Sequence, residues 1–263
     1  MGCHAGSVPE LTWIAWVALA VGAVTVGISK TAIPGANIAV ALFAMVLPAK
    51  PSTAALLVLL IVADVFAVVF YRRFADWRVL RGLVPPVVVG LVAGAVFMSR
   101  ASDALMARVI GVILIAVIVL GLVQRHRAQR REAAGGGDRV PQGRGAAVAQ
   151  RAFYGSLGGF TTMVANAAGP IMSMYFLAVR LPVTVFLGTS AWFYFVINLS
   201  KVPFSAALGL FSTEMLLIDL VLVPFVVLGA LGGRWIVNRI SRDFFEWSVI
   251  VLSILGAVYL LVR

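Results

Sequence analysis

The sequence predicts an all-α integral membrane protein of two inverted-topology repeats, each of about five transmembrane or re-entrant helical segments. Three observations predict this class. The 263 residues are 62% hydrophobic and only 12% charged, whereas soluble domains are about half apolar and a quarter charged. Apolar stretches close to the 20 or so residues that cross a bilayer recur from Leu11 to Val262. Landmarks of the first half also return in the second.

Breaks between apolar stretches divide the chain into ten segments, five on each side of a basic, Gly-rich stretch. We therefore expect an N-terminal membrane repeat over 11–123, a linker over 124–151 and a C-terminal membrane repeat over 152–262. The expected segments are 12–28, 34–47, 52–70, 82–98, 104–123, 152–165, 169–179, 183–202, 214–232 and 244–262.

The shared landmarks are prolines, glycines and one polar position. Pro182 lies 134 residues after Pro48, and Asn198 lies at the same spacing from Asp64. Gly90 and Gly94 correspond to Gly229 and Gly233 at a spacing of 139. Because five is an odd number of segments, the second copy enters the membrane in the opposite orientation, as in inverted-repeat transporters.

Charge predicts the orientation. Sixteen of the 21 lysines and arginines fall on one side if the 124–151 loop is cytoplasmic and both termini are outside, and basic loops favour the cytoplasm. The net charge of +11 therefore indicates membrane orientation and not nucleic acid. The short second and seventh segments leave open whether segments 1–2 and 6–7 span or re-enter the membrane. The N-terminus lacks a basic region before a short apolar stretch, so we expect the first span to be retained.

Several classes of chemistry lose support. Cys3 is the only cysteine, and His4 and His126 stand alone, so we expect no metal site and no cofactor. A phosphate-binding loop, an H-E-x-x-H pair and a nucleophile elbow are all missing, which argues against an enzyme.

Two polar interruptions occupy the same place in each half: "GISKTAIPGAN" at 27–37 and "GGFTTMVANAAGP" at 158–170. Paired breaks of this kind indicate the substrate site of a transporter, and helix N-termini with polar donors suit an anion. The alternative is a pair of ordinary turns at the membrane surface. The candidate substrate-binding residues are Lys30, Thr31, Gly35, Asn37, Thr161, Thr162, Asn166, Gly169, Asn198 and Lys201.

Asp64 is the one acidic residue that we place well inside the membrane, where a charge is expensive. It is a candidate proton carrier, or the partner of a cation, or a structural carboxyl bonded to a helix end. Lys201 either supplies a second positive charge for an anion or extends to the outer surface. We expect the glycine pairs, including Gly155 and Gly159, to pack helices together, and the run "WFYFVIN" to face lipid or core.

These stretches, with "VADVFAVVFYRRFADW" and "FLGTSAWFYFVINLSKVPF", resemble the TauE/SafE family of sulfite and organosulfur-anion exporters over nearly the whole chain. The resemblance implies a secondary transporter of the cytoplasmic membrane with duplicated halves that moves sulfite or C2 sulfonates. The sulfur comes from the resemblance alone. Many relatives have a glycine-richer first break than "TAIPGAN", which puts the shape of the substrate in question.

The sequence therefore predicts a multi-pass exporter of a small sulfur-containing oxyanion in the cell membrane, with lipid around it and no nucleic-acid partner. Export is driven either by a proton gradient, with Asp64 as carrier, or by the membrane potential alone. The alternatives are an anion channel, or a membrane enzyme or assembly subunit without transport. Whether the chain forms a homo-oligomer is left open.

Overall fold

The computed structural model describes residues 11–31, 36–133 and 144–237, together with 251, 254–255, 257–259 and 261–262. Within these ranges every regular element is a helix. The elements before the 134–143 gap are α1 (Trp13–Thr31), α2 (Ala36–Val46), α3 (Ala49–Tyr71), the short 3-10 helix η1 (Arg72–Phe74), α4 (Trp77–Arg100) and α5 (Asp103–Ala133). Those after it are α6 (Arg144–Ala165), α7 (Gly169–Ala178), α8 (Val183–Ala207) and α9 (Thr213–Val237).

Six of the described helices, α1, α3, α4, α5, α8 and α9, are long and apolar enough to cross a membrane. This confirms an all-α, multi-pass membrane protein. The 22-residue α6 is not in this set, and its first turns carry Arg144 and Arg151. The expected segment at 244–262 lies largely outside the described residues.

Two helices are too short to cross the bilayer alone. The α2 helix has 11 residues and α7 has 10, which at about 1.5 Å per residue reaches roughly half of a 30 Å hydrocarbon core. Each follows a longer helix directly, since α1 precedes α2 and α6 precedes α7. The two polar interruptions thus separate a long helix from a half-length one in both halves of the chain.

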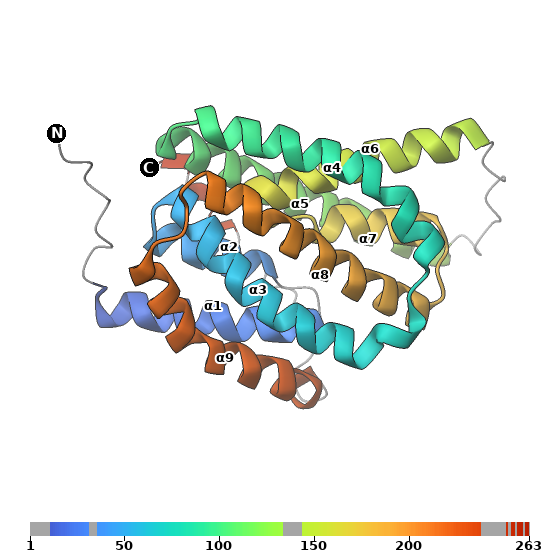
Figure 1. Cartoon of the computed structure of the whole chain (residues 1–263). Coiled ribbons are helices and arrows are strands. Elements are labelled where there is room, and N and C mark those ends of the chain that lie inside the picture. Colours follow the sequence, from blue (N-terminus) through green and yellow to red (C-terminus); the bar gives the residue numbers. More distant parts are fainter. Residues whose placement is uncertain are drawn as a thin grey trace.

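The 124–151 stretch is more helical than the expected linker. The α5 helix continues to Ala133 and α6 begins at Arg144, so both helices extend past their apolar segments. The start of α1 and the turn between α8 and α9 lie at one end of the bundle (Figure 1). The start of α6 and the η1 turn lie at the other end (Figure 1).

Helices from different halves cross at glycines. A Cβ on Gly27 of α1 would come within 2.2 Å of the Val226 carbonyl oxygen of α9, and one on Gly229 within 2.2 Å of the Val24 carbonyl oxygen. Because both obstacles are backbone atoms, only glycine allows this approach. Figure 1 shows α1 and α9 side by side along one edge of the bundle.

The pair α4 and α6 repeats this arrangement at the opposite edge (Figure 1). A Cβ on Gly90 would meet the Ser156 carbonyl oxygen at 2.1 Å, and one on Gly159 would meet the Val87 carbonyl oxygen at 2.3 Å. Val87 and Gly90 stand 139 positions before Val226 and Gly229. The glycines are packing residues, as expected. The matched crossings agree with two copies of one unit, while the opposite orientation of those copies stays a prediction.

Candidate functional site

Several of the buried polar side chains contact one another where the ends of α1 and α6 meet α3 and α8. The α3 helix has 23 residues, and Asp64 stands between the apolar stretches of its middle and its end. Asp64 has no exposed surface. Lys30 stands in the last turn of α1, where a cation also suits the negative end of a helix dipole. We call the set Lys30, Asp64, Thr162, Asn166, Asn198 and Lys201 the central cluster.

Asp64 is the partner of a cation. Its Oδ1 lies 2.8 Å from Nζ of Lys30. The Asp64 side chain is 0% exposed and the Lys30 side chain 12% exposed. Asn198 donates a second contact from Nδ2 to Oδ2 of Asp64 at 2.6 Å. A buried carboxylate needs such partners, since an isolated charge in an apolar medium is very costly.

Lys201 is buried although it is a lysine, with only 1% of its surface exposed. Its ammonium donates to Asn198 Oδ1 at 3.0 Å, to Thr162 Oγ1 at 3.3 Å and, over a very short contact, to Asn166 Oδ1. An ammonium has three N–H donors, and all three find a neutral oxygen. Of the two alternatives for Lys201, extension to the outer surface does not hold, because the side chain is buried in the bundle.

The conformation of Asn166 places its amide between two helices. Asn166 follows the end of α6 with a φ of +52°, a left-handed conformation that asparagine adopts more readily than most residues. Its Nδ2 donates to the Thr53 carbonyl oxygen of α3 at 2.9 Å, and its Oδ1 accepts from Lys201 of α8. The second polar interruption is thus joined to both central helices.

Tyr194 adds an aromatic wall that the sequence did not indicate. Nζ of Lys30 lies 4.2 Å from the centre of the Tyr194 ring, a distance suited to a cation–π interaction. The Tyr194 hydroxyl donates to the Gly169 carbonyl oxygen at 3.4 Å. Part of the run "WFYFVIN" therefore lines the cluster. Spacing alone did not distinguish Tyr194 from its aromatic neighbours.

The other candidates divide into three groups. Gly169 joins the site through its backbone, at the first residue of α7. The Thr161 hydroxyl donates to carbonyl oxygens of its own helix, at Leu157 and Gly158, and Asn37 is half-buried on α2. Gly35 and the side chain of Thr31 lie outside the described residues.

Asp219 of α9 corrects the expectation that Asp64 is the only acid deep in the bundle. Its side chain is 1% exposed, and both carboxylate oxygens lack a hydrogen-bond partner among the described residues. Asp219 stands near the start of an apolar helix, where a hydropathy pattern does not separate a surface acid from a buried one.

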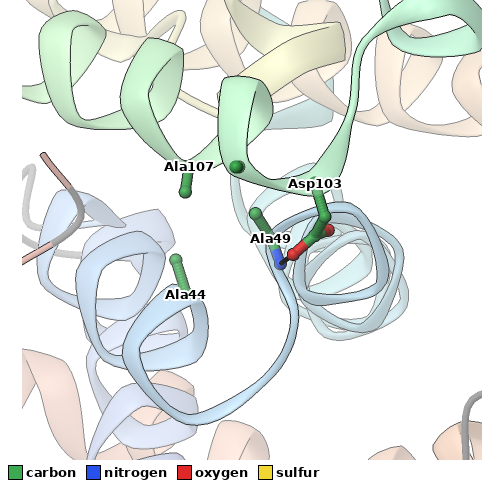
Figure 2. Close-up of a pocket in the computed structure, with 5 residues that line it drawn as sticks. Ala44, Ala49, Asp103 and Ala107 are labelled. Atoms are coloured by element: carbon green, nitrogen blue, oxygen red, sulfur yellow. Dashed lines mark hydrogen bonds between the residues drawn. The ribbon is translucent and has the colours of Figure 1, made fainter. Parts of the chain in front are cut away.

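A cavity of about 130 Å³ lies away from the cluster, lined by Ala44, Ala49, Asp103, Ala104 and Ala107 (Figure 2). The Asp103 carboxylate accepts from the backbone N–H groups of Ala49 at 3.1 Å and Lys50 at 2.9 Å. Asp103 thus caps the first turn of α3, and we interpret this cavity as structural. Within the described ranges, no three His, Cys, Asp or Glu side chains gather as a metal would require.

The long apolar helices, with half-length helices beside them and buried charges where they meet, define a multi-pass membrane protein of the transporter class. Residues 14–260 match the family described as sulfite exporter TauE/SafE. The chain belongs to this family, which confirms the resemblance seen in the sequence and supports a transporter over an enzyme. No curated protein and no solved structure matches the chain.

Proposed function

We propose that the protein exports a small sulfur-containing oxyanion, sulfite or a C2 sulfonate, from a site at the central cluster. The observation that carries this proposal is the convergence of both polar interruptions on one place. Lys30 comes from the first, and Thr162 and Asn166 from the second, and they meet through Asp64, Asn198 and Lys201. Family membership supplies the sulfur.

The donors suit an oxyanion. Lysine, threonine and asparagine side chains all provide N–H or O–H groups, and bonds from a charged donor are the stronger ones. Lys201 has no carboxylate partner among the described residues, so the cluster holds more positive than negative charge. The α7 helix begins at Gly169, whose carbonyl oxygen accepts from Tyr194, and a helix N-terminus is the positive end of its dipole.

Proteoliposome uptake tests the proposal. Purified protein is given labelled sulfite, sulfate, thiosulfate and a C2 sulfonate, with and without a pH gradient. We expect saturable uptake of at least one of the sulfur anions, with counterflow when unlabelled substrate is loaded inside. Uptake that neither saturates nor shows counterflow supports the alternative, an anion channel. Absence of flux for all four anions would contradict the proposal. The remaining alternatives would then be a membrane enzyme or an assembly subunit.

The driving force is tested in the same vesicles. A negative-inside potential expels an anion by about 2.3 kcal/mol per charge per 100 mV, so export needs no proton. If Asp64 carries a proton, Asp64→Asn retains binding and loses uptake driven by the pH gradient. A variant driven as well as the wild type excludes that role. We place the protein in the cytoplasmic membrane, with both of its termini outside the cell.

A further inference from the structure

We propose that the central cluster selects singly charged anions over doubly charged ones, and that the Asp64 carboxylate sets this preference. The inference rests on the proposed function, because it assumes that the anion binds at this cluster. It adds the charge of the substrate, which neither the family nor the composition supplies.

The charge of the cluster follows from its contacts. Lys30 and Lys201 each bring one positive charge, and Asp64 brings one negative charge 2.8 Å from Lys30. The three oxygens around Lys201 match the three N–H donors of an ammonium. The side chains that supply these oxygens, Thr162, Asn166 and Asn198, are neutral. With both lysines protonated and Asp64 ionised, the cluster therefore carries one net positive charge.

Burial makes this sum decisive. Asp64 and Lys201 are 0% and 1% exposed, so water does not screen them as it screens surface charges. A bound monoanion brings the site to neutrality. A dianion leaves one uncompensated negative charge in the bundle, which is costly at membrane depth.

The contacts also indicate how an anion meets the two lysines. Lys30 is the more exposed, at 12% of its side chain, and one of its three donors faces Asp64. Lys201 is sealed, so an anion oxygen that reaches it must replace one of its three acceptors. The Thr162 hydroxyl, at 3.3 Å, makes the longest of these contacts. We infer that the anion binds Lys30 directly and displaces Thr162 from Lys201.

The test compares two anions of similar shape and different charge. Methanesulfonate is a monoanion and sulfate a dianion, and both present oxygens around sulfur. Binding of each to the purified full-length chain is measured by titration calorimetry at one pH. We expect the wild type to bind methanesulfonate at least tenfold more tightly than sulfate. A wild type that binds sulfate as tightly or more tightly would overturn the inference.

Variants change the charge of the cluster in steps. Asp64→Asn keeps the size of the side chain and raises the net charge to two, so the ratio of the two affinities should shift at least tenfold toward sulfate. The matched control is Asp103→Asn, which removes a carboxylate from the cap of α3 and should leave the ratio unchanged. An Asp64→Asn protein with the wild-type ratio would contradict the inference.

A double variant keeps the inference testable if Asp64→Asn does not fold. Lys30→Met with Asp64→Asn removes the ion pair and restores one net positive charge, so methanesulfonate should again be preferred at least tenfold. A double variant that prefers sulfate would overturn the charge argument. Binding of neither anion to the wild type, with no uptake of any sulfur anion, would instead contradict the proposed function.

Discussion

Asn198 donates a 2.6 Å hydrogen bond to Asp64 across 134 residues, between two positions that the sequence predicts to be counterparts. If the two halves are copies of one unit, a position and its counterpart meet only close to the axis that relates them. The contact joins α3 to α8 and agrees with the predicted repeat. It also joins the ion pair of Asp64 to the ammonium of Lys201, which Asn198 contacts with its other amide atom.

The ion pair of Lys30 and Asp64 should show energetic coupling. Removing one partner of a buried pair costs about 3–5 kcal/mol, because it leaves the other charge without compensation. We expect Asp64→Asn to lower the free energy of unfolding toward the lower part of that range, since Lys30 retains some exposure. The double variant Lys30→Met, Asp64→Asn should recover part of the loss.

Thermal or denaturant unfolding in detergent of the wild type, Lys30→Met, Asp64→Asn and the double variant gives the coupling energy. Losses that simply add in the double variant would show that the two side chains do not stabilise one another.

Lys201 should matter for affinity, and the adjacent residues Thr161 and Thr162 of α6 offer a comparison. Charge-assisted hydrogen bonds contribute roughly 1.5–3 kcal/mol, or about ten- to a hundredfold in affinity. Lys201→Met is expected to raise the dissociation constant of the transported anion by that factor. Thr162→Ala should instead lower the dissociation constant by a smaller factor, because it removes the acceptor that the anion displaces from Lys201. Thr161→Ala should have almost no effect, because the Thr161 hydroxyl bonds its own helix. Equal changes in the dissociation constant for Thr161→Ala and Thr162→Ala would mean that the Thr162 hydroxyl is not part of the binding site.

Much of the fold and part of the site can be predicted from the sequence. Hydropathy finds the long helices, and the two polar breaks indicate the short helices α2 and α7. Asp64, Asn198 and Lys201 can be singled out because polar groups are expensive in apolar runs. The breaks contribute Lys30 and Asn166 to the same place, as their matched positions suggested.

The remaining features depend on packing, which hydropathy does not describe. Tyr194 stands among other aromatic residues, and only the approach of α1 brings it beneath Lys30. That α1 crosses α9, and α6 crosses α4, follows from which glycines face each other in space. The pairing of Lys30 with Asp64 is likewise invisible in the sequence, because either lysine could have served the carboxylate.

The glycine crossings should tolerate no side chain. At Gly159 a methyl group would meet the Val87 carbonyl oxygen at 2.3 Å, and backbone has little freedom to move. We expect Gly159→Ala to cost about 3 kcal/mol, the upper end of the usual cost of overpacking. The control is Gly121→Ala on α5, where nothing lies within 4 Å and the helix gains up to about 1 kcal/mol. Thermal unfolding in detergent compares the two, and a Gly159→Ala protein as stable as Gly121→Ala would argue against the close approach of α4 and α6.

The orientation is testable by cysteine labelling. Single cysteines at Ser7 and Gly136, in a background without Cys3, should react from opposite sides of the membrane with an impermeant reagent. The charge bias predicts that Ser7 is outside and Gly136 inside. Equal labelling from outside would contradict the inverted repeat, and the reverse pattern would contradict only the orientation.

The buried carboxyl group of Asp219 should make the protein less stable to unfolding than an apolar residue at the same position would. A buried polar group without a partner costs about 1–3 kcal/mol, and both oxygens of Asp219 lack one among the described residues. Leucine has nearly the same branched shape, so Asp219→Leu should fill the space and raise the free energy of unfolding by a similar amount. Unfolding in detergent measures the change, with Glu214→Gln at the start of α9 as a control that should leave stability nearly unchanged.

Natural proteins retain such costly residues when function requires them, so a stabilised Asp219→Leu protein that no longer transports would identify Asp219 as part of the transport cycle. A destabilised variant would mean that the carboxyl group has a partner after all.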